Sequence, residues 1–290
     1  MTALLAADRV RFGRRTDIRL LVLLIPVILA VLYVNAFNSV TTPPQQDFFF
    51  DPPDPVAEAE LRAQQLAEWR AGLAAELPGF AFPASLLKVT GNVLPVILLA
   101  VYLATALVAG EFEWGTVRTV HLTSSRVAAM AVRILFVVLL VAIAVAIALL
   151  LFAILPFLLS FEGKSIQEFA VPVPDLVTTL GSQLITVLPF IAIPVLLSVL
   201  ARSTGLAFLM TLLLFVFDLA AAGAPIWAGS GVPWVPALTI SGSVGRIIGG
   251  ESTQFASLVP VGVSLAAVLA WSGLPIVAAV AWFRRTDLNE

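Results

Sequence analysis

The sequence contains no cysteine and a single histidine, His121, in 290 residues. Without cysteine, no disulfide can join the loops and no thiol chemistry is available. One histidine without a companion set of metal-ligating residues predicts no metal centre, and no Ser/His/Asp group is predicted that could act inside a bilayer. Charge is also scarce, since Asp, Glu, Lys and Arg make up 12% of the chain, about half the share in an ordinary soluble domain. We therefore expect no catalytic site in this chain.

The scarce charges leave several long intervals that contain no Asp, Glu, Lys or Arg, and we interpret six of these intervals as membrane spans. A helix rises about 1.5 Å per residue, so crossing a hydrocarbon core of ~30 Å takes roughly 20 apolar residues. A bilayer favours such helices because each satisfies its backbone hydrogen bonds internally. The intervals are Leu20–Gln46, Val89–Gly110, Ile134–Phe161, Leu176–Ala201, Ser203–Phe217 and Ser252–Phe283. The sequence predicts an all-α polytopic membrane protein with six transmembrane helices.

We interpret residues 1–290 as a single transmembrane domain. The predicted spans cover residues 20–37, 92–109, 127–160, 176–200, 205–222 and 257–283. The first span is expected to be a retained anchor, because no small-residue cleavage site follows it. The remaining segments are 1–19, 38–91, 110–126, 161–175, 201–204, 223–256 and 284–290.

Three of these segments and one span have features of their own. The basic segment 1–19 is either an amphipathic helix on the membrane surface or an ordinary basic flank. Within 38–91, a short helix over residues 54–77 is expected to pack on the outer mouth of the bundle, since Asp54 and Pro55 are good starting residues. The uncharged, Gly- and Pro-rich segment 223–256 is expected to be re-entrant-like. Pro189 and Pro194 should kink or unwind span four.

The distribution of basic residues predicts the orientation in the membrane. Arginines concentrate before span one, between spans two and three and after span six, whereas acids dominate the alternate loops. Because basic residues favour the cytoplasmic side, we expect both termini in the cytoplasm and residues 38–91 outside. Arg133, near the start of span three, is expected to reach back to the inner headgroups. The arginines that carry this pattern are Arg9, Arg11, Arg14, Arg15, Arg19, Arg118, Arg126, Arg133, Arg202, Arg284 and Arg285.

The most distinctive stretch follows span two. Acidic and aromatic residues precede a Gly-Thr pair and a basic residue, and a Ser-Arg pair opens span three; the residues are Glu111, Phe112, Glu113, Trp114, Gly115, Thr116, Arg118, Ser125 and Arg126. This stretch resembles the Glu-x-x-x-Gly-Thr and Ser-Arg pattern of the type-2 ABC transporter permease family. The family often has proline where Ser124 stands here. The topology of the whole chain is similar to the family in outline.

The resemblance implies that residues 110–126 form a cytoplasmic coupling helix that docks on a separate ABC ATPase subunit. Glu111 and Arg118 would then make polar contacts with the ATPase, and Phe112 and Trp114 would anchor the helix at the membrane surface. The partner ATPase, and not this chain, would bind ATP and Mg. A second permease copy or a homologous permease, and membrane lipid, would be the other partners; no nucleic acid is expected.

Three polar residues inside the predicted spans are candidates for a transport pathway. Asp218 is the one carboxylate within a predicted span, and such acids line cavities or proton paths. It could equally hydrogen-bond to a neighbouring helix, an interpretation that we slightly favour. Gln183 and Tyr102 could also line a path or join helices.

These observations predict the permease subunit of an ATP-driven exporter of hydrophobic or amphipathic substrates in the plasma (inner) membrane. An ion-coupled secondary transporter and a membrane assembly factor without transport activity are the alternatives. The first would need several ionisable groups within the membrane, and Asp218 stands nearly alone. The sequence does not specify the substrate, the direction of transport or the type of dimer.

Overall fold

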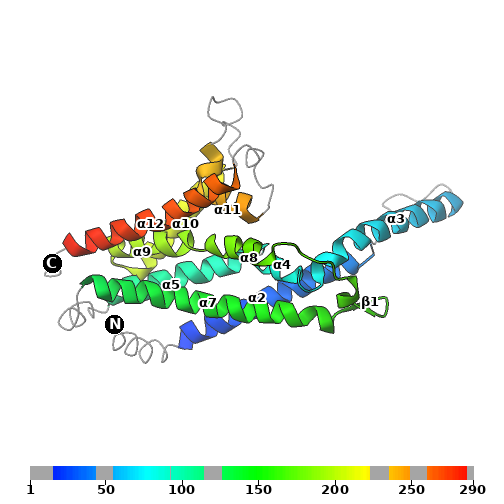
Figure 1. Ribbon diagram of the computed structural model, residues 1–290, viewed down its shortest axis with the longest axis horizontal. Helices are drawn as coiled ribbons and strands as arrows, with labels where there is room; N and C mark the ends of the chain where they lie inside the picture. The colour runs from blue at the N-terminus through cyan, green and yellow to red at the C-terminus, as the bar shows by residue number, and fades with distance from the viewer. Residues whose placement is uncertain are drawn as a thin grey trace.

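The computed structural model describes residues 16–43, 55–91, 93–113, 126–222, 235–248 and 260–285. These residues form an elongated bundle of helices, from one end of which a helix projects (Figure 1). Six helices are long and apolar enough to cross a membrane. The chain is therefore an all-α, multi-pass membrane protein, as the charge-free intervals predict.

The six spans begin or end a few residues away from their predicted bounds, and four of them are longer than predicted. They are α2 (Thr16–Thr41), α5 (Val93–Glu113), α7 (Arg126–Leu158), α8 and α9 together (Leu176–Ile185 and Pro189–Ala201), α10 (Thr204–Ala222) and α12 (Val261–Arg285). A helix does not end where its first charged residue appears, since its backbone hydrogen bonds continue. Asp17, Glu113 and Arg285 therefore belong to terminal turns of the spans.

The other elements lie between the spans along the chain. They are α3 (Pro55–Glu76), η1 (Leu77–Phe80), α4 (Ser85–Gly91), β1 (Ser160–Phe161), β2 (Lys164–Ser165), η2 (Ile166–Phe169), η4 (Val235–Leu238) and α11 (Ile240–Ile248). The strands β1 and β2 pair antiparallel. The helix α11 lies within the segment expected to be re-entrant-like, and it packs on α12, α10 and α8.

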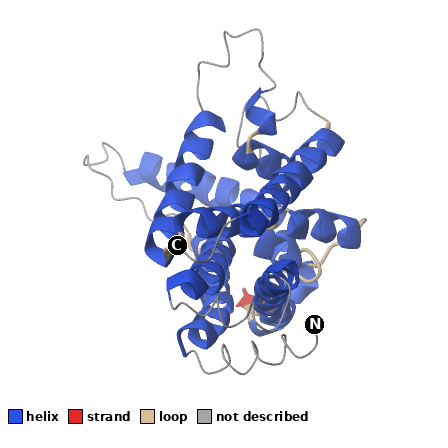
Figure 2. Cartoon of the chain, turned by 90° about the vertical axis from the view of Figure 1, so that its left-hand side faces the viewer, coloured by secondary structure: helices blue, strands red, loops and turns tan. Residues whose placement is uncertain are grey.

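The helix α9 forms the centre of the bundle. It packs against α12, α5, α10 and α7, and its first seven residues, 189–195, are all buried. Figure 2, in which the left-hand side of Figure 1 faces the viewer, shows that the described residues are almost entirely helical. By contrast, α10 has the smallest buried share of the six spans. Its apolar surface faces away from the bundle, as expected for a helix in contact with lipid.

Span four is interrupted, as its prolines predict. The helix α8 ends at Ile185 and α9 begins at Pro189, whose ring nitrogen cannot donate a hydrogen bond. Across the break the backbone takes tighter, i to i−3 hydrogen bonds: Thr186 N donates to Gln183 O and Leu188 N to Ile185 O, each at 3.1 Å. The predicted unwinding of span four is confirmed. The break places three residues of irregular backbone, 186–188, directly before the buried helix α9.

The projecting helix α3 corrects one expectation. We expected residues 54–77 to pack on the outer mouth, but most of α3 is exposed and extends beyond the bundle (Figure 1). Only its last turns make contact: Trp69 Nε1 donates to Val40 O at 3.1 Å, and Leu73 is buried. Leu61 and Leu66 of α3 are 45% and 38% exposed, so the bundle does not cover them.

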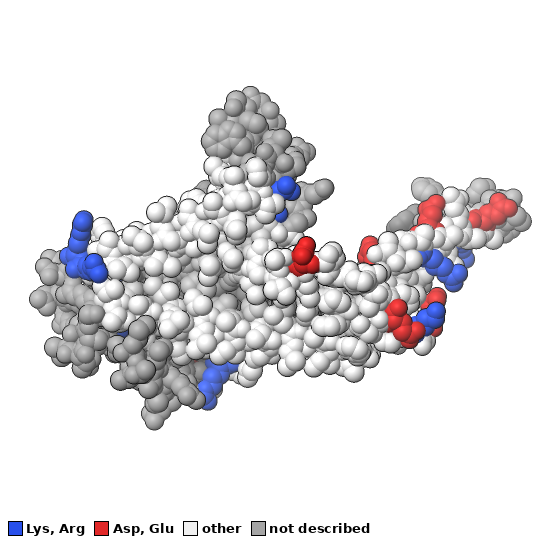
Figure 3. Space-filling model, in the orientation of Figure 1, with Lys and Arg blue, Asp and Glu red and all other residues white. Residues whose placement is uncertain are grey.

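Charged side chains gather towards the ends of the molecule. Figure 3 shows basic side chains at the end where α12 finishes, and acidic and basic side chains together towards α3. The middle of the visible surface is almost free of charge. This band of uncharged surface is what contact with lipid hydrocarbon requires.

Candidate functional site

The predicted coupling segment lies only partly within the described residues. Trp114, Gly115, Thr116, Arg118 and Ser125 lie outside them, and of Arg126 only the backbone, at the start of α7, is described. The described part is the last turn of α5, which contains Glu111, Phe112 and Glu113.

Glu111 is buried in the bundle and paired with Arg133 of α7. Arg133 Nη2 lies 3.0 Å from Glu111 Oε2, and the two side chains are 4% and 1% exposed. Both sequence-based expectations were wrong: Glu111 does not face the cytoplasm, and Arg133 does not reach the headgroups. Because α5 continues to Glu113, Glu111 remains inside the bundle, where an acid needs a charged or polar partner.

The buried pair is not fully satisfied by the described residues. Arg133 Nε is buried and has no hydrogen-bond partner among them. A buried ion pair is stable only when its remaining donors and acceptors are also paired. This pair therefore joins α5 to α7 while the Arg133 Nε lacks a hydrogen-bond partner among the described residues.

Glu113 joins the end of α5 to the start of α10. Its exposed carboxylate accepts hydrogen bonds from Thr204 N at 2.6 Å and from Thr204 Oγ1 at 2.9 Å. The first N–H groups of a helix have no intrahelical acceptor, and an acid is favoured there by the helix dipole. Glu113 is thus a cap for α10 that comes from 91 residues earlier in the chain.

Phe112 packs on α12. Its ring meets that of Phe283 edge-on, with centroids 5.8 Å apart and planes at 86°. Its ring is partly buried against this helix, and its predicted role as an anchor at the membrane surface stays a prediction. Such an edge-to-face contact adds about 0.5–1.5 kcal/mol beyond area burial.

Three consecutive side chains at the end of α5 thus contact three different spans. We call this set the α5 junction; its members are Glu111 with Arg133 of α7, Phe112 with Phe283 of α12, and Glu113 with Thr204 of α10. Successive side chains on a helix point about 100° apart, so a central helix can reach three neighbours within one turn. The sequence analysis selected these residues but assigned them to a cytoplasmic coupling helix and not to contacts between spans.

Asp218 caps the short helix α11. Its Oδ1 accepts from Ile240 N at 2.9 Å and its Oδ2 from Ser241 N at 2.7 Å. The interpretation that Asp218 hydrogen-bonds to a neighbouring helix is confirmed. Two further bonds fix the same end of α11: Gly242 N donates to Thr239 Oγ1 at 3.0 Å, and Trp271 Nε1 of α12 donates to Leu238 O at 2.9 Å.

The other two pathway candidates lie elsewhere in the bundle. The Tyr102 hydroxyl of α5 donates to Asp17 Oδ2, in the first turn of α2, at 2.8 Å. Gln183 is buried in α8 just before the break in span four. Tyr102 and Asp218 therefore each hold a different pair of elements together.

A crevice lies beside the break in span four. It measures about 220 Å³ and is lined by residues of α7, α12 and the start of α9: Ile134, Val138, Leu188, Ile191, Leu269, Ser272, Gly273 and Ile276. The Ser272 hydroxyl donates to Val268 O at 2.7 Å within α12. The lining is otherwise apolar, so the crevice suits hydrocarbon and not an ion.

Comparison of the chain with protein-family models, curated proteins and solved structures gave no match. The functional argument therefore depends on the residues and contacts described above. The α5 junction is its centre, because there the most distinctive stretch of the sequence meets three spans.

Proposed function

We propose that this chain is the permease subunit of an ATP-driven ABC transporter that exports a hydrophobic or amphipathic substrate. The observation that carries the proposal is the α5 junction. The sequence stretch that resembles a coupling helix begins at this junction, so an ATPase docked on the stretch would act on the one turn that contacts α7, α10 and α12.

The contacts support a mechanical role for this turn. A force on residues 114–125 would be applied to the end of α5 and the start of α7, which these residues connect. This force would be transmitted to three neighbouring spans through the ion pair, the Glu113 cap and the Phe112 ring. The break between α8 and α9 supplies a place where one half of span four can move relative to the other.

The remaining parts of the complex follow from the same proposal. Two permease chains, identical or homologous, would assemble with two ATPase subunits that bind ATP and Mg. The complex would lie in the plasma membrane with both termini in the cytoplasm. The described ionisable groups within the spans favour this proposal over an ion-coupled transporter, because Glu111 pairs with Arg133 and Asp218 caps α11.

A bulky substitution in the coupling stretch tests the proposal. Gly115→Trp should abolish co-purification of a Walker-motif ATPase with the tagged chain, because an indole at this position would obstruct docking. The measurement is mass spectrometry of the complex purified from native membranes, together with its ATP hydrolysis.

The matched control places the same side chain at the other end of the bundle. Gly181 of α8 has no atom within 4 Å of an added Cβ, so Gly181→Trp should leave the ATPase bound. Absence of any Walker-motif ATPase from the wild-type complex, or its full retention by Gly115→Trp, would contradict the proposal.

The proposed orientation has its own test. Because the chain lacks cysteine, Glu60→Cys on the exposed part of α3 and Arg285→Cys at the end of α12 each create a single thiol. A membrane-impermeant maleimide applied to intact cells should label position 60 and should reach position 285 only after permeabilisation. Labelling of position 285 in intact cells would reverse the orientation.

A further inference from the structure

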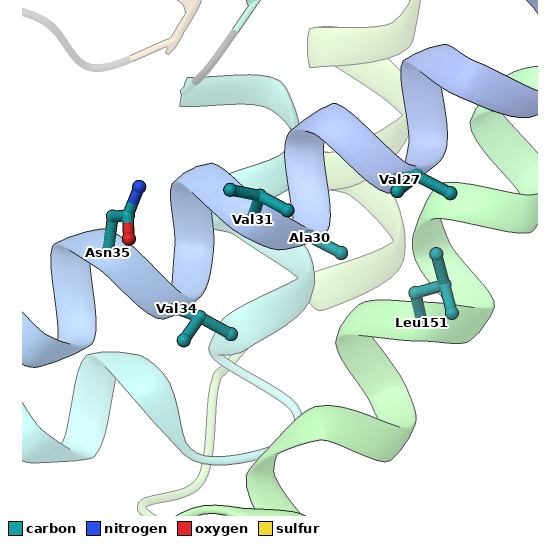
Figure 4. Close-up of a pocket in the computed structure, with 6 residues that line it drawn as sticks. All are labelled: Val27, Ala30, Val31, Val34, Asn35 and Leu151. Carbon is teal, nitrogen blue, oxygen red and sulfur yellow. The ribbon is translucent and has the colours of Figure 1, made fainter.

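A groove of about 350 Å³ lies on the outside of the bundle between α2 and α7 (Figure 4). Its lining residues share one face of α2, with one wall from α7: Val27, Ala30, Val31, Val34, Asn35 and Leu151. Val27 and Val31 are 52% and 53% exposed, so the groove opens to the surroundings of the bundle. We call it the α2–α7 groove.

The spacing of the α2 residues explains the shape of the groove. Positions 27, 30, 31 and 34 recur at helical spacing and therefore share one face. Ala30 leaves a hollow between the larger valines, and Leu151 closes the side towards α7 (Figure 4). Both helices are membrane spans, so the medium in front of this apolar groove is lipid.

Asn35 gives the groove a polar end. It lies eight residues beyond Val27, or ~12 Å along the helix axis, and its side chain is exposed. No described residue forms a hydrogen bond with its side chain. Asn38 and Ser39 follow within about one turn, so Asn35 stands where the apolar part of α2 meets the polar interface. The exposed Asn35 amide can therefore take a hydrogen-bond partner from outside the bundle.

We propose that the α2–α7 groove binds one acyl chain of a bilayer phospholipid, with the Asn35 amide donating a hydrogen bond to the ester carbonyl of that chain. The ester carbonyl only accepts hydrogen bonds, and the Asn35 side chain has two N–H donors. The chain would lie along α2 from Asn35 to Val27, against Ala30 and Leu151. This inference does not depend on the proposed transport function.

The size of the groove favours a lipid chain over a helix of a second copy. A helix is about 10 Å wide, so a piece ~12 Å long occupies roughly 900 Å³, more than twice the volume of the groove. Such a helix could only rest on the rim formed by Val27 and Val31. A single hydrocarbon chain can enter the hollow above Ala30.

The test uses the full chain, purified in detergent and titrated with dioleoyl phosphatidylcholine, with bound lipids counted by native mass spectrometry. Ala30→Phe fills the hollow and should remove one bound lipid per chain. Asn35→Leu keeps the size of the side chain but removes its donors, and should weaken binding of that lipid roughly 2- to 10-fold, the value of one neutral hydrogen bond. The diether analogue, which lacks ester carbonyls, should bind wild type as weakly as the diester binds Asn35→Leu.

Two variants on α2 serve as controls. Ile28→Phe adds the same ring on a face outside the groove, and Asn38→Leu removes an amide one turn further on; both should bind like wild type. Equal lipid binding by wild type and Ala30→Phe would overturn the groove as a lipid site. Equal affinity of wild type for diester and diether lipid would overturn the role of Asn35. A wild-type dimer that Ala30→Phe dissociates would assign the groove to a second copy and would also overturn the proposal.

Discussion

Arg133→Met should destabilise the protein by about 3–5 kcal/mol, since it leaves the buried Glu111 carboxylate without its charged partner. Methionine keeps most of the apolar stem of arginine but lacks the guanidinium end, so the loss reports mainly the missing charged group. Glu111→Leu should have an effect of the same size, because it leaves the Arg133 guanidinium buried and unpaired. The measurement is the thermal midpoint of the detergent-solubilised protein, followed by size-exclusion chromatography.

The double variant Glu111→Leu/Arg133→Met decides whether the pair itself is the cause. A buried ion pair exchanged for apolar residues of similar volume is often neutral or stabilising by about 1–4 kcal/mol. Because Arg133 Nε has no partner among the described residues, the double variant should be at least as stable as wild type. Arg285→Met, at an exposed arginine, should change stability by no more than about 0.5 kcal/mol. A double variant as unstable as the single ones would show that the apolar side chains do not fit.

The same four proteins separate stability from coupling. If the α5 junction transmits force as proposed, the double variant should fold well but show a weakened link between ATP hydrolysis and transport. In that case the ion pair is retained at a cost in stability, because it joins α5 to α7 in a fixed register.

The spans could be predicted from the sequence because their cause is local. Twenty apolar residues need no partner to indicate a span, and a proline interrupts a helix wherever it lies. The break before Pro189 and the start of α3 at Pro55 agree with prediction for this reason. The packing of α3 did not agree with prediction, because the spacing of its apolar residues does not say whether another part of the protein lies close enough to cover them.

The contacts of the site could not be predicted because they depend on tertiary register. Glu111 lies at the end of an apolar run and looks like the first residue of a loop. Its burial requires that α5 continue to Glu113 and that α7 present Arg133, 22 residues later, at the same height. One feature of the sequence could have predicted this contact: Glu111 and Arg133 carry opposite charges and lie near the facing ends of consecutive spans. The cap from Asp218 to α11 gave no signal of this kind, since a cap is normally found next to its helix.

Asp218→Leu should release the start of α11, because two backbone N–H groups lose their acceptor at once. Hydrogen bonds to a charged group contribute about 1.5–3 kcal/mol each, so we expect a local loss of roughly 3 kcal/mol. The amides of Ile240 and Ser241 should then exchange with deuterium on the order of 100-fold faster, since each 1.4 kcal/mol is tenfold. Hydrogen-exchange mass spectrometry over residues 235–248 is the measurement.

Asp218→Asn distinguishes a cap from a pathway residue. The amide retains one acceptor oxygen but turns an N–H towards the second donor, so exchange in α11 should lie between wild type and Asp218→Leu. Thr239→Val removes the neutral hydrogen bond from Gly242 N and should cost about 1 kcal/mol. Phe217→Leu, at a ring 72% exposed beside Asp218, should leave α11 unchanged. If Asp218 is a cap, transport per assembled complex should fall in the same order as the protection of α11. Loss of transport in Asp218→Asn with wild-type exchange in α11 would contradict this and would place Asp218 in the transport pathway.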